Sequence, residues 1–294
     1  MDSLLQANCS LAPLTSFKVG GPAQWYAEPT RADEVIRLLQ WARDEALPVT
    51  FLGAGSNLLI SDHGLPGLVI GSRLAKGARF EPATGQVTVL AGEPIPRLAW
   101  AAARRGWRGL EWSVGIPGSL GGAVVMNAGA QGGCLADSLV QATVLGPTGL
   151  EVWEAERLAY GYRQSRLQQG DYWVIEATLQ LQPGQDPKQV LADTTCNLRQ
   201  RKGTQPYHLP NCGSVFRNPE PQKAGQLIES LGLKGHCIGQ AQVAEKHANF
   251  ILNLGNARAE DILALIRYLQ ASVRTEYGVD LEPEVKLLGA FPDV

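Results

Sequence analysis

The sequence has few features of a disulfide-bonded, metal-binding, membrane or nucleic-acid-binding protein. Its five cysteines are odd in number, scattered and never spaced as CxxC, so neither a disulfide framework nor a metal site is predicted. No apolar run approaches the roughly 20 residues of a membrane span, and the N-terminus has no basic and apolar signal segment. With 26 basic and 28 acidic residues, no overall charge favours nucleic acid. We therefore expect a cytoplasmic protein with reduced thiols.

The chain has the composition of a globular protein with a sizeable core. Of its 294 residues 45% are hydrophobic and 18% charged, and this length predicts two or three packed lobes. Residues 1–70 alternate strand and helix patterns, residues 71–186 read as short strands between Gly and Pro turns, and residues 187–278 are mainly helical. The sequence therefore predicts a mixed α/β first lobe, an antiparallel second lobe and a third domain.

Several helices have clear start or stop signals. Thr30 is expected to cap a helix that ends before Pro48, with Val35, Ile36, Leu38, Leu39 and Ala42 on its apolar face. Helices are also predicted at 94–106 and 190–202, at 224–232 with Gly232 as the stop, and at 257–278 with Gly278 as the stop. The last apolar run, 279–289, reads as a strand that must pair with an earlier one.

Two glycine-rich segments are candidates for ligand binding. The first, "GAGSN" at 53–57, has backbone N–H groups that can form a phosphate nest, although a tight turn is an equal alternative. A classical dinucleotide site is disfavoured because Leu58 replaces the third glycine, and no GK[ST] motif indicates a P-loop. The second segment, 113–133, has so many small residues that close passage against a large flat cofactor explains it better than a series of turns.

A third segment, "NCGSVFRNP" at 211–219, contains two possible reactive groups. Cys212 offers a thiol and Ser214 a hydroxyl, while a Ser after Gly is most often a turn residue. The residue types alone leave a nucleophilic cysteine, a catalytic serine and a turn as alternatives.

Seven motifs in order resemble one known family. The chain is similar, from about Thr15 to Gly289, to the UDP-N-acetylenolpyruvoylglucosamine reductase (MurB) family of peptidoglycan precursor synthesis. The motifs are "GAGSN", "GIPGSLGGAVVMNAGA", "YGYRQS", "NCGSVFRNP", "AGQLIESLGLKG", "KHANFILN" and "LEPEVKLLG". The resemblance implies an α+β fold, in which a two-lobed FAD-binding domain of the vanillyl-alcohol oxidase (PCMH) type precedes a C-terminal α+β substrate-binding domain. It also implies that strand 279–294 returns to the first lobe.

The same resemblance implies a reaction and three catalytic residues. NADPH reduces noncovalently held FAD, which then passes hydride to the β carbon of UDP-N-acetylglucosamine enolpyruvate and gives UDP-N-acetylmuramate. Arg163 matches the arginine that binds the substrate carboxylate, which suits a planar guanidinium. Ser214 matches the proton donor to the α carbon, and Glu284 matches the acid that stabilises the intermediate. Cys212 then becomes a bystander.

The resemblance also implies the binding residues. Those expected at FAD are Gly53, Ala54, Gly55, Ser56, Asn57, Ile116, Gly118, Ser119, Gly121, Gly122, Asn127 and Gly129. Those expected at the sugar nucleotide are Lys202, Asn218, Lys286 and His247. For His247 a purely structural role is an equal alternative. No metal is expected.

The spacing of the motifs points to the shorter form of the family. Only 51 positions separate Arg163 from Ser214, which leaves little room for the extra loop that closes a tyrosine over the substrate in the longer form. We expect a monomer whose partners are NADPH and the sugar nucleotide. The alternatives are an FAD oxidase acting on a small alcohol, and a binding protein without catalysis that would tolerate loss of Ser214.

Overall fold

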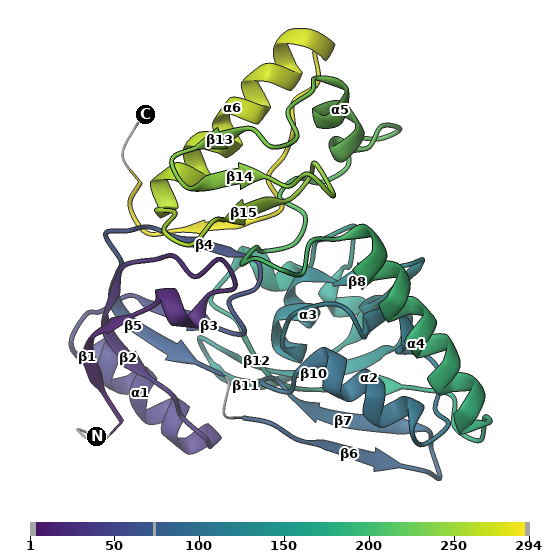
Figure 1. Cartoon of the computed structure of the whole chain (residues 1–294). Coiled ribbons are helices and arrows are strands. Elements are labelled where there is room, and N and C mark those ends of the chain that lie inside the picture. Colours follow the sequence, from purple (N-terminus) through teal and green to yellow (C-terminus); the bar gives the residue numbers. More distant parts are fainter. Residues whose placement is uncertain (1–3, 73–74, 292–294) are drawn as a thin grey trace.

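A computed structural model describes residues 4–72 and 75–291, in which three β-sheets of three or more strands organise the fold beside two two-stranded pairs (Figure 1). The first sheet belongs to lobe 1 at the N-terminus, the second to lobe 2, and the third to the C-terminal domain. Short helical turns lie between the main elements: η1 (Ala12–Leu14), η2 (Glu111–Ser113), η3 (Leu135–Asp137), η4 (Ala155–Leu158) and η5 (Arg166–Gln169). No helix within the described ranges is long and apolar enough to cross a membrane.

Lobe 1 is a four-stranded sheet with one covering helix. Strand order is β1-β2-β5-β3, with β1 antiparallel and the other pairs parallel. The elements are β1 (Gln6–Ser10), β2 (Pro22–Ala27), α1 (Ala32–Asp44), β3 (Val49–Leu52), β4 (Leu58–Ile60) and β5 (Leu65–Gly71). The expected strand, helix, strand order is confirmed.

Two details of the helix prediction are wrong. Helix α1 begins at Ala32, and its cap is Arg31 in place of Thr30. Thr30 lies one residue earlier, where its backbone N and its hydroxyl both donate to the Glu34 carboxylate. Ile36 is 48% exposed, whereas Leu38 is fully buried against the sheet. The apolar face is therefore narrower than the sequence pattern suggested.

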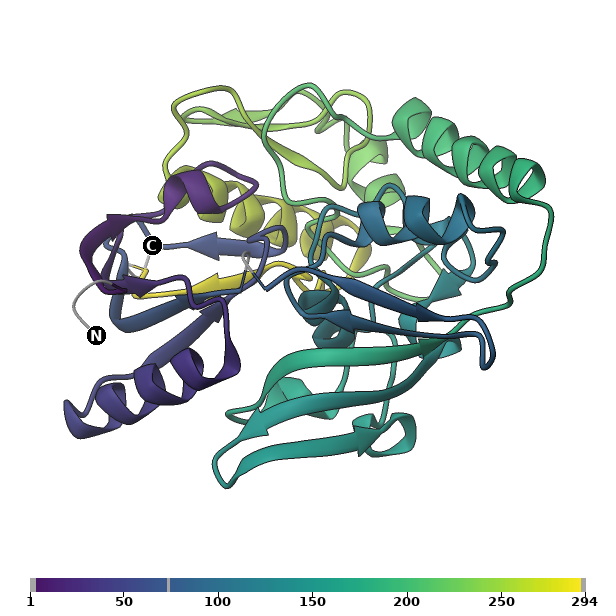
Figure 2. The same cartoon turned by 90° about the horizontal axis from the view of Figure 1, so that it is seen from below.

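Lobe 2 is the antiparallel sheet that the sequence predicted. Strand order is β11-β10-β12-β7-β6, and α2 lies above these strands in Figure 2. The elements are β6 (Ala78–Glu81), β7 (Gln86–Leu90), α2 (Ile95–Ala103), α3 (Leu120–Met126), β8 (Gly129–Ala130), β9 (Gly133–Cys134), β10 (Leu139–Gly146), β11 (Gly149–Glu154) and β12 (Trp173–Gln180). A stacked pair, Phe51 and Trp173, joins lobe 2 to lobe 1.

The C-terminal domain packs two helices on a small sheet. Its elements are α5 (Ala224–Ser230), β13 (Cys237–Ile238), β14 (Ala241–Val243), β15 (Ile251–Asn253) and α6 (Ala259–Tyr277). Gly232 follows α5 at φ +68° and Gly278 ends α6 at φ +67°, so both predicted glycine stops are confirmed. Phe17, Val19 and Leu59 of the first lobe complete the core of this domain.

Helix α4 (Pro187–Thr204), the predicted helix at 190–202, lies beside lobe 2. Arg108 forms an ion pair with Asp193 at 2.7 Å, and Gln131 donates to the carbonyl oxygen of Asn197 at 3.0 Å. The helix is thus attached to lobe 2 while the chain that leaves it enters the C-terminal domain. Our boundary between residues 186 and 187 stays a prediction.

The last strand returns to the first lobe. Strand β16 (Lys286–Leu288) pairs in parallel with β4, Leu287 opposite Leu59. This pairing gives the apolar run at 279–289 its partner, although only three of its residues form the strand. The return places the residues just before β16 at the junction of all three parts of the molecule.

Asn253 provides a test of how the C-terminal domain is attached. Asn253 is 1% exposed. Its Nδ2 donates to Phe17 O at 2.8 Å, and its Oδ1 accepts from Gly255 N at 2.8 Å and from Ala257 N at 3.0 Å. We predict that Asn253→Ala lowers the free energy of unfolding by about 2–4 kcal/mol, because buried polar groups lose their partners. Urea unfolding would measure this. The exposed neighbour Asn256→Ala should change it by less than about 0.5 kcal/mol, and equal effects would contradict the prediction.

Candidate functional site

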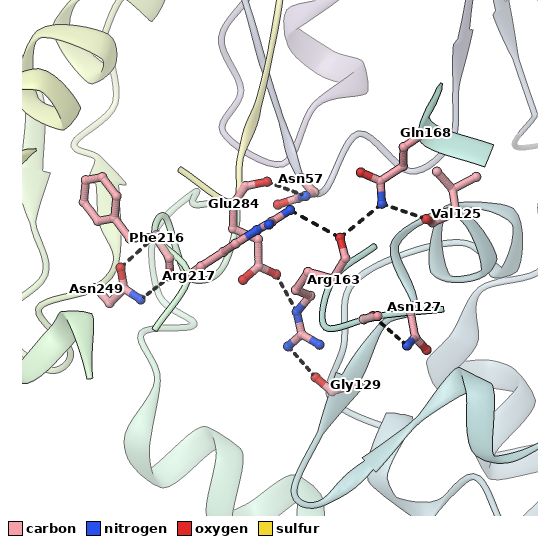
Figure 3. Close-up of polar contacts among 11 residues, drawn as sticks. Asn57, Val125, Asn127, Gly129, Arg163, Gln168, Phe216, Arg217, Asn249 and Glu284 are labelled. Atoms are coloured by element: carbon pink, nitrogen blue, oxygen red, sulfur yellow. Dashed lines mark hydrogen bonds and ion pairs between the residues drawn. The ribbon is translucent and has the colours of Figure 1, made fainter. Parts of the chain in front are cut away.

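Arg163 lies where lobe 2 meets the C-terminal segment. Its Nε donates to Glu284 Oε1 at 2.8 Å and its Nη2 donates to Gly129 O at 2.8 Å (Figure 3). The two charged side chains are 20% and 15% exposed, so this ion pair is shielded on most sides yet open to a ligand. The structure therefore brings together two of the three expected catalytic residues, which are 121 positions apart in the chain.

The segment "NCGSVFRNP" pairs with the segment that carries Glu284. Glu284 N donates to Val215 O at 2.7 Å, and Arg217 N donates to Glu282 O at 2.9 Å. Gly213, at φ +84°, turns the chain into this pairing. Ser214 follows it and directly precedes Val215, the residue that accepts from Glu284 N. Ser214 is partly exposed, whereas Cys212 is buried.

The surroundings separate the thiol from the hydroxyl. Burial raises the pKa of the Cys212 thiol far above its ordinary value, and the nearby carboxylate of Glu284 raises it further. A thiol held in this way stays protonated and is a poor nucleophile. The geometry therefore supports Ser214 over Cys212 as the reactive group of this segment.

Asn249 fixes the same segment from the C-terminal domain. Its side chain accepts from Phe216 N at 2.9 Å and donates to Phe216 O at 2.8 Å, and Val215 N donates to Asn249 O. Asn249 is 4% exposed, so it acts by shaping the strand beside Ser214.

The first glycine loop lies against both the catalytic segment and the second glycine region. Asn57 Nδ2 donates to Glu284 O at 3.0 Å, and Lys286 N donates to Asn57 O at 3.0 Å. A Cβ on Gly53 would lie 2.8 Å from Ser119 Oγ, and one on Gly118 would lie 3.4 Å from Ser56 Oγ. The two glycine segments therefore lie against one another and form one surface beside Arg163 and Glu284.

The residues of this surface fit a bound FAD. Ser119 Oγ is buried and has no hydrogen-bond partner among the described residues, which suits contact with a polar ligand. Eight of the twelve expected FAD residues are at least partly exposed: Gly53, Ala54, Ser56, Asn57, Ile116, Gly118, Gly122 and Gly129. The exposed glycine backbones provide N–H donors for phosphate.

The remaining expected FAD residues have roles inside the protein. A Cβ on Gly55 would clash with Leu14 O, and one on Gly121 would lie 3.0 Å from the Cβ of Ala91. Asn127 donates to Gly161 O and accepts from Ala136 N, both at 3.0 Å. Internal packing therefore explains part of the glycine content, and cofactor contact need not explain all of it.

The expected substrate residues share no hydrogen bond or ion pair with one another within the described ranges, unlike Arg163 and Glu284. Lys202 and Lys286 are exposed, and Asn218 Oδ1 accepts from Ala224 N at 3.2 Å, near the start of α5. Asn218 lines a pocket with Tyr162, Arg217 and Glu282, next to the ion pair of Arg163. His247 accepts from Asn249 N at 3.3 Å and packs on Phe250, which is the arrangement of a structural histidine.

Sequence reasoning missed one residue at this site. Gln168 donates to the carbonyl oxygen of Arg163 at 3.1 Å and to Val125 O at 3.0 Å. Nothing in its local sequence distinguishes it from the neighbouring glutamines, because its contacts depend on the fold of the turn. A search for motifs therefore had no signal to find it.

The structural contacts of His247 predict a pH effect on stability. Burial lowers its pKa below the ordinary imidazole value, with Lys234 adding to the shift. Its stabilising contribution is therefore complete above about pH 6.5 and is lost as the pH falls through the lower folded-state pKa. We predict that the stability advantage of the wild type over His247→Gln shrinks from about pH 7.5 to about pH 5, measured by urea unfolding. Parallel curves for the two proteins would contradict this.

Comparisons with known proteins agree with the geometry. Residues 205–288 match the C-terminal domain of UDP-N-acetylenolpyruvoylglucosamine reductase, and residues 23–154 match an FAD binding domain. The reductase of that name from Synechococcus elongatus is 66% identical over 290 residues, covering 99% of this chain and 96% of the relative. The one from Synechocystis sp. is 53% identical, covering 98% and 92%.

A solved structure has the same fold over nearly its whole length. The crystal structure of UDP-N-acetylenolpyruvylglucosamine reductase (MurB) from Thermus caldophilus is 36% identical, with a TM-score of 0.82, and covers 97% of this chain and 98% of its own. The expected fold class is confirmed: an α+β chain with an FAD-binding domain followed by a C-terminal domain. This chain therefore belongs to the UDP-N-acetylenolpyruvoylglucosamine reductase (MurB) family, the FAD-dependent oxidoreductases of peptidoglycan precursor synthesis.

Proposed function

We propose that this protein uses NADPH to reduce the enolpyruvyl group of UDP-N-acetylglucosamine enolpyruvate and thereby forms UDP-N-acetylmuramate. One observation carries the proposal: the ion pair of Arg163 and Glu284 lies beside Ser214 and is joined to the first glycine loop through Asn57. An enolpyruvyl group needs a carboxylate contact, a proton donor and a redox cofactor at one place. These residues supply the first two next to the surface that fits the third.

The glycine surface would hold the cofactor, with the partly exposed Gly53, Ser56 and Gly118 along it. Ser119 Oγ, which has no hydrogen-bond partner among the described residues, would be a polar contact. A bound FAD would supply the redox chemistry, which is the transfer of hydride from NADPH to the β carbon of the enolpyruvyl group. The protein then has to orient the substrate and manage one proton.

Arg163 binds the substrate carboxylate. Its Nη1 has no hydrogen-bond partner among the described residues, while Nε and Nη2 are held by Glu284 and Gly129. A guanidinium fixed on two sides presents its third donor in one direction, which orients the carboxylate. Its positive charge also stabilises the negative charge that develops there during hydride transfer.

Ser214 delivers the proton to the α carbon. A hydroxyl is a weak acid, so nearby cations must stabilise the alkoxide as the proton leaves. The guanidinium of Arg163 is the cation that the structure supplies, because its partner Glu284 is held through its backbone to Val215, the neighbour of Ser214. Glu284, held by its backbone to the neighbour of Ser214, completes the set of polar groups around the reacting carbons.

Anaerobic half-reactions test this function. The bound flavin is reduced with NADPH, the enolpyruvyl sugar nucleotide is added, and the flavin absorbance is followed. We expect reoxidation without oxygen and formation of the muramate product. Reoxidation by oxygen alone would support an FAD oxidase and reject the proposal.

Ser214→Ala separates the two half-reactions. We expect flavin reduction by NADPH to continue, while reoxidation by the sugar nucleotide slows by roughly 10²–10⁴-fold because the proton donor is lost. Stopped-flow absorbance measures both rates. Unchanged reoxidation would assign proton transfer to another group, and an equal loss of both half-reactions would indicate a defect in folding or FAD binding.

Glu284 and Glu282 form a matched pair for a second test. Glu282 lies two residues earlier, is 65% exposed and pairs with Arg217 at 3.0 Å, whereas Glu284 is 15% exposed and pairs with Arg163. We predict that Glu284→Gln lowers kcat by roughly 10²–10³-fold because the charged partner that holds Nε of Arg163 in place is lost. Glu282→Gln should change it by no more than about threefold. The reverse order in steady-state assays would reject the assignment of Glu284.

A further inference from the structure

The backbone of Arg163 has an unusual conformation. Its φ is +58°, in the left-handed region that residues other than Gly, Asn and Asp rarely occupy. Such a conformation persists only when surrounding contacts hold it in place, and it is common at functional sites. The contacts that hold Arg163 therefore also determine where its guanidinium points.

Two side chains from different parts of the molecule donate to the carbonyl oxygen of Arg163. Gln168 Nε2, from lobe 2, lies 3.1 Å away, and Arg217 Nη2, from the C-terminal domain, lies 3.4 Å away. Figure 3 shows both pointing at this oxygen while the guanidinium of Arg163 extends toward Glu284 and Gly129. The carbonyl is thus held by two donors and the side chain by two acceptors.

Each donor is itself fixed by a second contact. The Gln168 amide also donates to Val125 O at 3.0 Å, in the last turn of α3, and the guanidinium of Arg217 pairs with Glu282 at 3.0 Å. The side chain of Arg217 is only 12% exposed, so its guanidinium lies mostly within the protein. Neither donor is free to follow Arg163 if that residue moves.

The end of α3 is the reference point for this turn. Ser165 Oγ also donates to Val125 O at 2.6 Å, and Asn127 Nδ2 donates to Gly161 O at 3.0 Å. Helix α3 begins directly after Ser119, in the glycine surface that fits FAD. The turn that carries Arg163 is therefore attached to the same helix that shapes the cofactor site.

We propose that Gln168 and Arg217 are positioning residues for Arg163. By holding its carbonyl oxygen, they keep the left-handed backbone and direct the guanidinium at the substrate carboxylate, at a fixed place relative to the flavin. The inference rests on the proposed function, because it concerns the arginine that binds the carboxylate. It adds that the orientation of this arginine depends on one donor from each of the two domains that meet there.

The physical effect is preorganisation. When a substrate carboxylate binds, it attracts the guanidinium, and an unrestrained turn would shift toward it and away from the productive geometry. Donors on the carbonyl oppose that shift, and displacement of a catalytic group by about 1 Å can slow a reaction by up to roughly 100-fold. Loss of either donor should therefore slow hydride acceptance by the substrate without removing FAD.

The experiment uses the FAD-loaded protein and the anaerobic reoxidation rate at saturating enolpyruvyl sugar nucleotide. We expect Gln168→Met and Arg217→Met each to slow reoxidation by about 10-fold, with unchanged flavin content. Arg217→Lys, which keeps a charged donor, should recover most of the rate. The control Gln169→Met, at an exposed neighbour of Gln168, should stay within about threefold of the wild type.

A double-mutant cycle with Arg163→Lys tests whether the two residues act through Arg163. If they do, adding Gln168→Met or Arg217→Met to Arg163→Lys changes the reoxidation rate by less than about twofold. A further 10-fold loss in that background would mean direct contact with the substrate and would overturn the proposal. Unchanged rates in both single variants would overturn it as well. Failure of the wild type to be reoxidised would instead reject the proposed function, so the two failures are distinguishable.

Discussion

The backbone pairing of residues 282–288 is the constraint on which the rest of the site depends. Glu284 N donates to Val215 O in the C-terminal domain, and Glu284 O accepts from Asn57 of the first glycine loop. Strand β16 then pairs with β4 of lobe 1. One short stretch of backbone therefore joins two domains, and its carboxylate reaches lobe 2 through Arg163. Without this return the three parts would have no common site.

The electrostatics of the site follow from that junction. Arg163, Arg217 and Glu284 come from separate parts of the chain and are mostly shielded from water. Charges in such surroundings interact more strongly than they would at the surface, so each must have a partner. Glu284 and the carbonyl of Gly129 provide partners for Arg163 while leaving one donor for a ligand. Burial and the nearby carboxylate of Glu284 also raise the pKa of the Cys212 thiol, which favours its protonated form.

A glycine needed for internal packing and one needed beside a ligand look the same in a sequence. Gly53 and Gly118 lie where the two loops approach one another, at the surface proposed to hold FAD, whereas Gly121 is required by contact with Ala91. Both situations exclude a side chain, and both produce the same pattern of small residues. Only the surroundings of each glycine show whether protein or ligand occupies the space where a side chain would be.

The sequence by itself determined the local elements and the chemical groups of the site. Gly278 ends α6 as predicted because a left-handed helix cap is a local property of glycine. The motifs around Arg163, Ser214 and Glu284 supplied the groups that we propose take part in the reaction. The tertiary structure alone decided that Ile36 faces solvent, that α4 packs against lobe 2, and that Gln168 and Arg217 meet at the carbonyl of Arg163. These features depend on contacts between residues far apart in the chain or on a backbone angle set by them. Local patterns carry no record of such contacts.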